Sequence, residues 1–130
     1  MNLEPTSSNP TQMYKTVFKG VSEEMQMCIQ NCIQCAQVCE QMIQYCLNKG
    51  GSHADPAHIR RLQDCVDICT TSARFMIRGS DMHSATCGVC AQACQACAED
   101  CEKMADDEMM QLCAEICRRC ADTCQKMSQH

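Results

Sequence analysis

Four stretches of this chain repeat an apolar or sulfur-bearing residue every three or four positions, with glutamine and charged residues in most of the gaps. The first stretch contains Met25, Cys28, Cys32, Cys35, Cys39, Met42 and Cys46 in unbroken order. Alternating steps of three and four place side chains on one face of an α-helix. The pattern therefore predicts four amphipathic helices, each with a stripe of thiols along its buried face.

The other three stripes have a similar composition. They contain Leu62, Cys65, Cys69, Ser72 and Met76; then His83, Cys87, Cys90, Cys94, Cys97, Cys101 and Met104; then Met109 or Met110, Cys113, Cys117, Cys120, Cys124 and Met127. The positions off the stripes are polar, as a solvated outer face requires. They include Gln30, Gln34, Gln37, Gln41, Glu99, Glu102, Lys103, Arg118, Arg119 and Asp122.

Glycine, proline and short polar residues mark the expected helix boundaries. Gly50 and Gly51 end the first helix. The second helix begins at Asp55 and Pro56 and ends at Gly79. Ser80 or Asp81 caps the third helix, and Asp107 caps the fourth. Connections this short force neighbouring helices to run antiparallel. The expected fold class is all-α: an antiparallel up-down-up-down four-helix bundle with a short extra N-terminal helix.

The N-terminal region differs from the bundle. Residues 1–10, with two prolines and two serines, are expected to form a disordered tail, and residues 11–130 a single domain. We expect the extra helix at about residues 11–20, because Gly20 and Ser22 interrupt the apolar rhythm. One long kinked helix is the alternative.

Cysteine replaces the usual core residues. The 130 residues include 16 cysteines, whereas Leu, Ile, Val and Phe together number only 18, a level that alone would be typical of disorder. Packing alone does not explain why every cysteine lies in a stripe. Nine aliphatic residues flank the thiols, and we expect them to seal neighbouring helices; a subunit interface is the alternative. They are Ile29, Ile33, Ile43, Leu47, Val66, Ile68, Val89, Leu112 and Ile116.

Charge and composition exclude several classes of function. A net charge of -5, no tryptophan and four other aromatic residues leave no basic or aromatic surface for nucleic acid. No run of apolar residues is long enough to span a membrane. Residues 1–20 lack the apolar segment of a signal peptide, and we therefore expect the protein to be cytoplasmic. The mature form of an exported protein would have the same sequence features. No catalytic constellation is present, so we expect no enzyme.

The thiol stripes fit a soft metal ion better than disulfides. Residues three or four apart on a helix have Cβ atoms about 5–6 Å apart, whereas a disulfide needs about 3.5–4.5 Å. Thiolate and thioether ligands together select Cu(I), zinc or iron–sulfur clusters. Zinc favours four ligands converging from loops, and iron–sulfur clusters need loop spacings that are absent here. Cu(I) is therefore the best match.

Charge arithmetic supports an interior filled with Cu(I). Each thiol that binds Cu(I) exchanges one proton for one monovalent cation, whereas zinc with four thiolates leaves a buried charge of -2. If every thiolate bridges two ions, the capacity is roughly sixteen Cu(I) ions per chain. A zinc or cadmium buffer like metallothionein, and a thiol redox protein that uses Cys87 and Cys90, remain alternatives.

The chain resembles the bacterial copper storage proteins. The segments that carry the resemblance are CIQNCIQCAQVC, CVDIC, CGVCAQACQACAEDC and CAEICRRCADTC, within residues 25–127. The resemblance implies a four-helix bundle whose interior cysteines bind many Cu(I) ions, and a member of the cytosolic branch that is often tetrameric. The expected partners are copper ions and a protein that donates or accepts them. Met42 and Ser72 depart from the pattern, because they occupy stripe positions without a thiol.

The two ends of the expected bundle differ in their side chains. Tyr14, Phe18 and Phe75 can plug the end where the first helix starts, although Met25, Met76, Met82, His83 and Met127 also lie there. The opposite end carries methionine thioethers, which bind Cu(I) more weakly than thiolates, and we expect it to be the mouth through which copper enters the bundle. The alternative is that these methionines only fill the core as flexible side chains. The predicted metal ligands are the 16 cysteines with Met42, His58, Met104, Met109 and Met110, and His53 and His130 are expected to be solvated.

Overall fold

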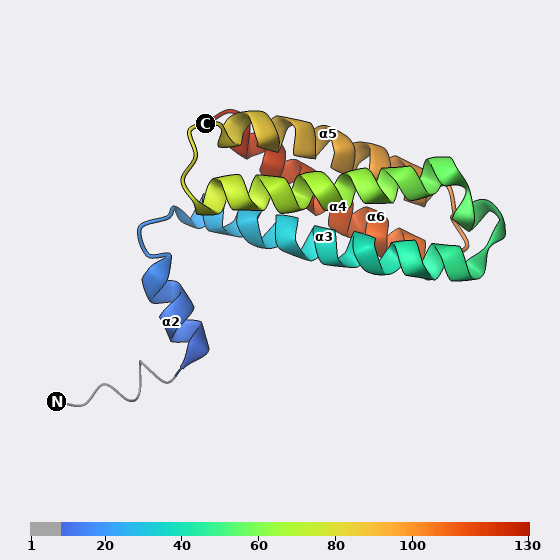
Figure 1. Ribbon diagram of the computed structural model, residues 1–130, viewed down its shortest axis with the longest axis horizontal. Coiled ribbons are helices and arrows are strands. Elements are labelled where there is room, and N and C mark those ends of the chain that lie inside the picture. The colour runs from blue at the N-terminus through green and yellow to red at the C-terminus, as the bar shows by residue number, and fades with distance from the viewer. Residues whose placement is uncertain (1–8) are drawn as a thin grey trace.

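The computed structural model describes residues 9–130, and the all-α prediction is confirmed (Figure 1). The helices are α2 (Pro10–Val17), α3 (Glu23–Lys49), the 3₁₀ helix η1 (Gly51–Ala54), α4 (Pro56–Ile77), α5 (His83–Glu102) and α6 (Glu108–Met127). Most of the tail expected at residues 1–10 lies outside the described residues. None of the described helices is long and apolar enough to cross a membrane.

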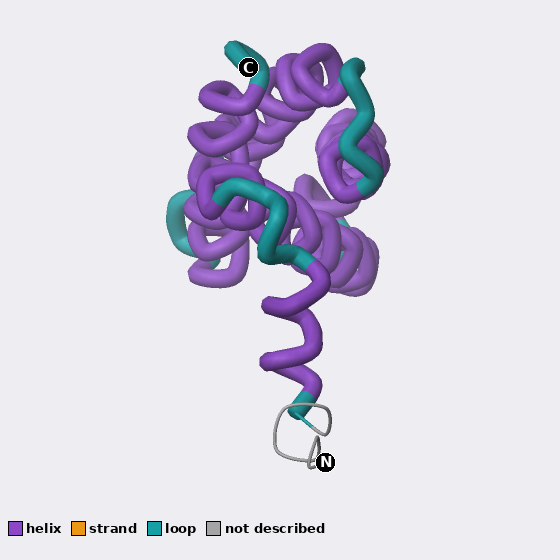
Figure 2. The backbone as a smooth tube through the Cα atoms, turned by 90° about the vertical axis from the view of Figure 1, so that its left-hand side faces the viewer, coloured by secondary structure: helices purple, strands orange, loops and turns teal. Residues whose placement is uncertain are grey.

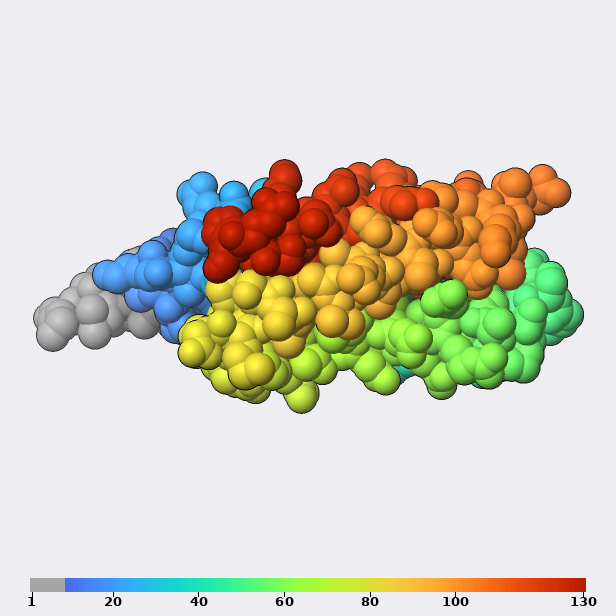
Figure 3. Space-filling model, turned by 90° about the horizontal axis from the view of Figure 1, so that it is seen from above, coloured from blue at the N-terminus to red at the C-terminus, as the bar shows by residue number. Residues whose placement is uncertain are grey.

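The four long helices form the predicted up-down-up-down bundle. Helix α3 packs against α4 and α6, and α5 packs against the same two helices. Figure 2 shows the four helices around a common axis, and Figure 3 shows the bundle as an elongated rod. The end with α2, the α4–α5 turn and the C-terminus is here called the α2 end, and the end with η1 and the α5–α6 turn is called the η1 end (Figure 1).

Most of the predicted helix boundaries are confirmed. The positive φ of 74° at Gly50 breaks the chain direction after α3, and Asp55 caps α4 by accepting a hydrogen bond from the Ala57 N–H. Gly79, with φ of 67°, follows α4 in a Schellman turn, in which the Ser80 N–H donates to the Phe75 carbonyl at 2.9 Å. Asp107 caps α6 by accepting from the Met110 N–H.

The expected cap of the third long helix is wrong. The N-cap of α5 is Met82, whose side chain makes no capping hydrogen bond. Ser80 lies two residues earlier, where its hydroxyl accepts a hydrogen bond from the Met82 N–H at 3.1 Å. The Schellman turn already fixes the backbone at Ser80, so the chain needs two further residues before it becomes helical.

Helix α2 is separate from the bundle, as the interruption at Ser22 predicted. Ser22 accepts a hydrogen bond from the Met25 N–H and starts α3 afresh. The side-chain amide of Gln26 donates to the carbonyls of Phe18 and Val21, so the intervening turn is held against α3. Helix α2 itself buries no residue and extends away from the rod (Figure 2).

The interior is built from sulfur. All 16 cysteines are fully buried, and Ile29 and Leu62 are the largest aliphatic side chains that are completely enclosed. The expectation that the flanking aliphatic residues seal the helices is wrong for several of them, because Val89, Leu47 and Ile33 remain 54%, 54% and 39% exposed. These side chains remain exposed because the thiol stripe already occupies the narrow inner face of each helix.

Candidate metal-storage site

The closest thiol contacts join different helices. Cys32 on α3 lies 3.4 Å from Cys124 on α6, and Cys65 on α4 lies 3.5 Å from Cys94 on α5 (Sγ to Sγ). A pair within one helix, Cys65 and Cys69, is 4.0 Å apart. All 16 cysteines are free thiols. The bundle therefore brings sulfur atoms together across its axis and leaves them unbonded.

These contacts form five groups of sulfur atoms, each with all members within 4.8 Å of one another. From the α2 end to the η1 end, the groups are Cys28–Cys87–Cys124; Cys32–Cys90–Cys120–Cys124; Cys35–Cys69–Cys94–Cys120; Cys35–Cys39–Cys65–Cys117; and Cys39–Cys97–Cys113–Cys117. Each group shares at least one thiol with the next. The sulfur atoms therefore form one continuous line along the bundle axis.

Shared thiols favour Cu(I) over zinc. A structural zinc ion takes four ligands in a closed tetrahedral set, whereas Cys124, Cys120, Cys35, Cys39 and Cys117 each belong to two neighbouring groups. A soft thiolate that bridges two monovalent ions can satisfy both groups at once. The convergence of four thiols from several helices depends on how the helices pack, which the spacing of pairs within single helices does not specify.

The arrangement does not favour a thiol redox site. Cys87 and Cys90, the pair considered for that role, are both fully buried. Their nearest contacts are Ser72 and Cys69 respectively, at 3.3 and 3.6 Å. Reactive cysteines are partly exposed thiolates, so these two thiols are poorly placed for exchange with another molecule.

Two thiols at the η1 end of the metal-free interior, those of Cys46 and Cys101, are held in their neutral form. Removal from water, together with the nearby Cys113, raises the pKa of Cys46 to about 11. Hydrogen bonds with Cys113 and Cys97, and then burial, raise the pKa of Cys101 above its ordinary range. A metal ion that binds here must therefore displace protons.

A mixed group of donors lies at the η1 end. The Sγ of Cys46 is 3.5 Å from the Nε2 of His58 and 3.8 Å from the Sδ of Met110. The Nδ1 of His58 lies 2.6 Å from a carboxylate oxygen of Asp100, which orients the ring. No sequence pattern links Asp100 to His58, because only the packing of α4 against α5 brings them together.

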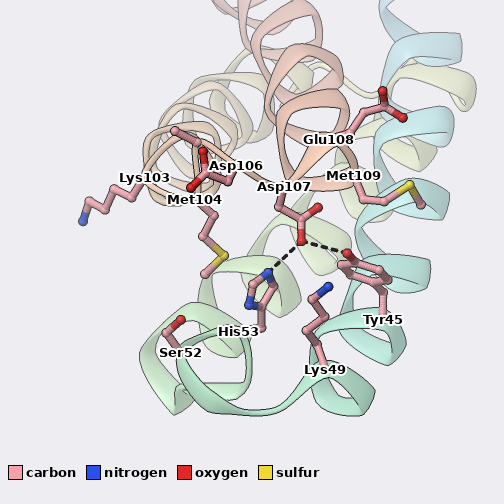
Figure 4. Close-up of a pocket in the computed structure, with 11 residues that line it drawn as sticks. Tyr45, Lys49, Ser52, His53, Lys103, Met104, Asp106, Asp107, Glu108 and Met109 are labelled. Carbon is pink, nitrogen blue, oxygen red and sulfur yellow. Dashed lines mark hydrogen bonds and ion pairs between the residues drawn. The ribbon is translucent and has the colours of Figure 1, made fainter.

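The other predicted donors at this end lie at different depths. Met42 is 3% exposed and faces the interior, and Met104 is half-buried. Met109 is 40% exposed and lines a pocket of about 580 Å³ at the surface (Figure 4). The expected donors thus extend from the surface to the first thiols.

His53 lies in the same pocket, and the expectation that it is solvated is wrong. Its Nε2 is 2.8 Å from a carboxylate oxygen of Asp107, which also accepts a hydrogen bond from the Tyr45 hydroxyl at 2.7 Å (Figure 4). Burial opposes ionisation of Asp107, but these two hydrogen bonds and the Met110 N–H lower its pKa to about 2. The cluster ties η1 to the first turn of α6. His130 is 54% exposed and pairs with Glu24.

A four-helix bundle with a continuous line of free, buried thiols defines a helical store for soft metal ions. Residues 21–129 match the copper storage protein family (Csp), and the chain belongs to that family. The resemblance predicted from the cysteine segments is thereby confirmed. Helix α2 lies before the matched region.

Several known proteins are similar to this chain. A structure of the Nmul_A1745 protein from Nitrosospira multiformis has 40% identity and a TM-score of 0.78, over 82% of this chain and 96% of that one. A Cu(I)-bound copper storage protein, BsCsp3, has 32% identity and a TM-score of 0.76, over 82% and 99%. A cytosolic copper storage protein from Streptomyces lividans, studied for copper loading, has 34% identity and a TM-score of 0.76, over 83% and 94%. The cysteine-rich protein YhjQ of Bacillus subtilis is 33% identical over 64 residues, which span 49% of this chain and 59% of that relative.

Proposed function

We propose that this chain binds and stores Cu(I) in its interior, with roughly one ion for each of its 16 cysteines. The observation that carries the proposal is the continuous line of shared thiol groups along the bundle axis. The Cu(I)-bound state of the similar protein BsCsp3 supports the choice of metal. The role is storage, without catalysis.

An anaerobic titration with Cu(I) against a chromophoric chelator tests this function. We expect the reduced protein to outcompete the chelator until roughly sixteen ions are bound. Saturation at four or five ions would indicate separate closed sites, as in a zinc or cadmium buffer. A parallel titration with zinc is the control, and we expect it to saturate at a much lower ratio.

We further propose that copper enters at the η1 end. Met109 lies at the surface, Met104 is half-buried, and Met42, His58 and Met110 lie beside the first thiols. Neutral thioethers bind Cu(I) more weakly than thiolates, so they can take an ion from a donor protein and release it inward. The 580 Å³ pocket beside Met104 and Met109 gives such a donor access to this end.

A variant with leucine at the four methionines of this end tests the direction of uptake. Met42, Met104, Met109 and Met110 are replaced, and the rate of Cu(I) uptake is followed by stopped-flow absorbance. We expect slower uptake and removal with nearly unchanged capacity. The matched control replaces Met25 and Met127 at the α2 end; slowing in the control alone would place the mouth there.

We also propose that the chain acts in the cytoplasm and assembles as a homo-tetramer. The exposed aliphatic side chains support self-association, because Ile33, Ile77, Val89 and Leu112 each remain more than a third exposed. Sedimentation of the purified protein tests the assembly. We expect a mass of four chains, and a Val89→Asp and Leu112→Asp variant to be smaller; a monomer at high concentration would contradict the proposal.

A further inference from the structure

The thiol group at the α2 end has one member fewer than the other four. Cys28, Cys87 and Cys124 form a group of three, whereas every other group has four sulfur atoms. Helix α4 supplies Ser72 at this level, and its hydroxyl lies 3.3 Å from the Sγ of Cys87. A neutral hydroxyl is a hard ligand and a poor partner for Cu(I). A soft donor is therefore missing from this level.

The next level outward supplies soft donors from all four helices. One turn beyond Cys28, Ser72, Cys87 and Cys124 lie Met25, Met76, His83 and Met127. Met76 and Met127 are each 1% exposed, and Met25 packs against the core. His83 is the only nitrogen donor in this level, and it lies four residues before Cys87 on the same face of α5.

The imidazole of His83 has its lone pair free and buried. Its Nδ1 lies 2.9 Å from the carbonyl oxygen of Ser80, which can only accept a hydrogen bond, so Nδ1 carries the proton. The Nε2 of the neutral ring is then an acceptor. Among the residues that the structure describes, this Nε2 is the one buried side-chain nitrogen or oxygen without a hydrogen-bond partner. Such an atom is costly to bury unless another group meets its lone pair.

We propose that His83 is a Cu(I) ligand and that its Nε2, one turn beyond the three-thiol group, binds an ion at the α2 end together with a thiol of that group. The inference rests on the proposed storage function and extends its ligand set beyond the residues predicted from the sequence. The imidazole donates its lone pair without losing a proton, and one thiol of the group releases its proton to solvent. An imidazole–Cu(I)–thiolate unit is electrically neutral, which suits a buried end of the bundle.

The surroundings of His83 fit a terminal storage position. Phe18 and Val21 pack against the buried cluster at the same end of the bundle, and the turn that contains them is held by Gln26. The Ser80 carbonyl fixes the ring through Nδ1, as backbone carbonyls commonly do for histidine ligands. An ion at this position is the last in the line of thiol groups, farthest from the mouth proposed at the η1 end.

Nuclear magnetic resonance of the unsubstituted protein with ¹⁵N-labelled histidine tests the inference directly, because Cu(I) is diamagnetic. We expect the Nε2 resonance of His83 to shift on full loading while its Nδ1 keeps a proton. His130 serves as the internal control, since its side chain is 54% exposed and pairs with Glu24 at the surface. An unmoved His83 Nε2 at saturation, or a shift of the Met76 and Met127 methyl resonances without one at His83, would overturn the inference.

Substitution supplies a second, independent readout. We expect His83→Leu to lose about one Cu(I) per chain at saturation, His83→Met to recover it, and His130→Leu to lose none. Full capacity in His83→Leu would overturn the inference. Failure of the storage function and failure of this inference give different results. A chain that binds only a few ions contradicts the storage function, whereas normal capacity with an unshifted His83 Nε2 resonance contradicts this inference alone.

Discussion

The Nε2 atom of His58 lies 3.5 Å from the Sγ of Cys46, the last thiol of the α3 stripe at the η1 end. The other ring nitrogen is held by Asp100 at 2.6 Å. An imidazole and a thiol from different helices thus meet where the line of sulfur atoms begins. A Cu(I) ion that enters at the η1 end, as proposed above, would reach this pair before the four-thiol groups.

Replacement of His58 is expected to slow copper uptake. In His58→Leu the first nitrogen donor is lost, and in Asp100→Asn the ring is less firmly oriented, so we expect uptake rates about tenfold lower for the first and a smaller reduction for the second. Stopped-flow absorbance during Cu(I) transfer measures both. Capacity should change by no more than about one ion. Equal rates in His58→Leu and in the control His130→Leu would contradict this role.

Capacity is expected to follow the number of thiols in the interior. Ser72→Cys adds a fourth sulfur beside Cys87, so we expect it to bind about one more Cu(I). Cys69→Ser removes a thiol that contacts Cys65, Cys90, Cys94 and Cys120, and should bind at least about one ion fewer. Titration against a chromophoric chelator measures both, with Ser72→Ala as the control. An unchanged capacity in Cys69→Ser would exclude a continuous line of bridging thiolates.

The metal-free bundle is expected to lose stability in alkali. The folded pKa of Cys46 is about 11, above the ordinary value of 9.0, so the folded state favours the protonated thiol. This contribution is fully present below about pH 9 and is lost as the pH rises through 11. We expect the unfolding free energy to fall by on the order of 2 kcal/mol across this range. Anaerobic urea unfolding measures it, and Cys46→Ser should show a smaller fall.

Asp107 is expected to stabilise the η1 end above about pH 4. Its pKa of about 2 lies below the ordinary 3.8, so its contribution is present above the ordinary value and is lost as the pH falls through 2. Asp107→Asn keeps a good N-cap but loses the charge beside His53, and we expect it to cost about 1 kcal/mol at neutral pH. Thermal unfolding of the metal-free protein measures this cost. The control Asp106→Asn, at an exposed neighbouring position, should have no effect.

The metal-free chain is expected to be helical already. Side-chain caps at Ser22, Asp55 and Asp107 begin three of the four long helices without any metal. Loading should then release about one proton per Cu(I) and change the helix content little. Circular dichroism and a pH indicator measure the two effects. A random-coil spectrum for the metal-free protein would contradict the preformed bundle.

The sequence by itself determined the helices, their order and the face on which each carries its thiols. These features are local: the spacing of Cys28, Cys32 and Cys35 fits one face of a helix whatever lies opposite, and Gly50 and Asp55 end and begin helices through their own backbone and side-chain preferences. The prediction that the thiols bind a soft metal ion followed from the same spacing, because packing alone does not explain so many cysteines in one helical register.

Only the tertiary structure decided which side chains meet. The contact of Cys35 with both Cys65 and Cys117 depends on how far α3, α4 and α6 slide along one another, which no spacing within a single helix specifies. The same relative placement brings His58 to Asp100 and His53 to Asp107. The tertiary structure also determined that Ile33 and Val89 remain exposed, because a bundle with four thiol stripes has no room for them inside.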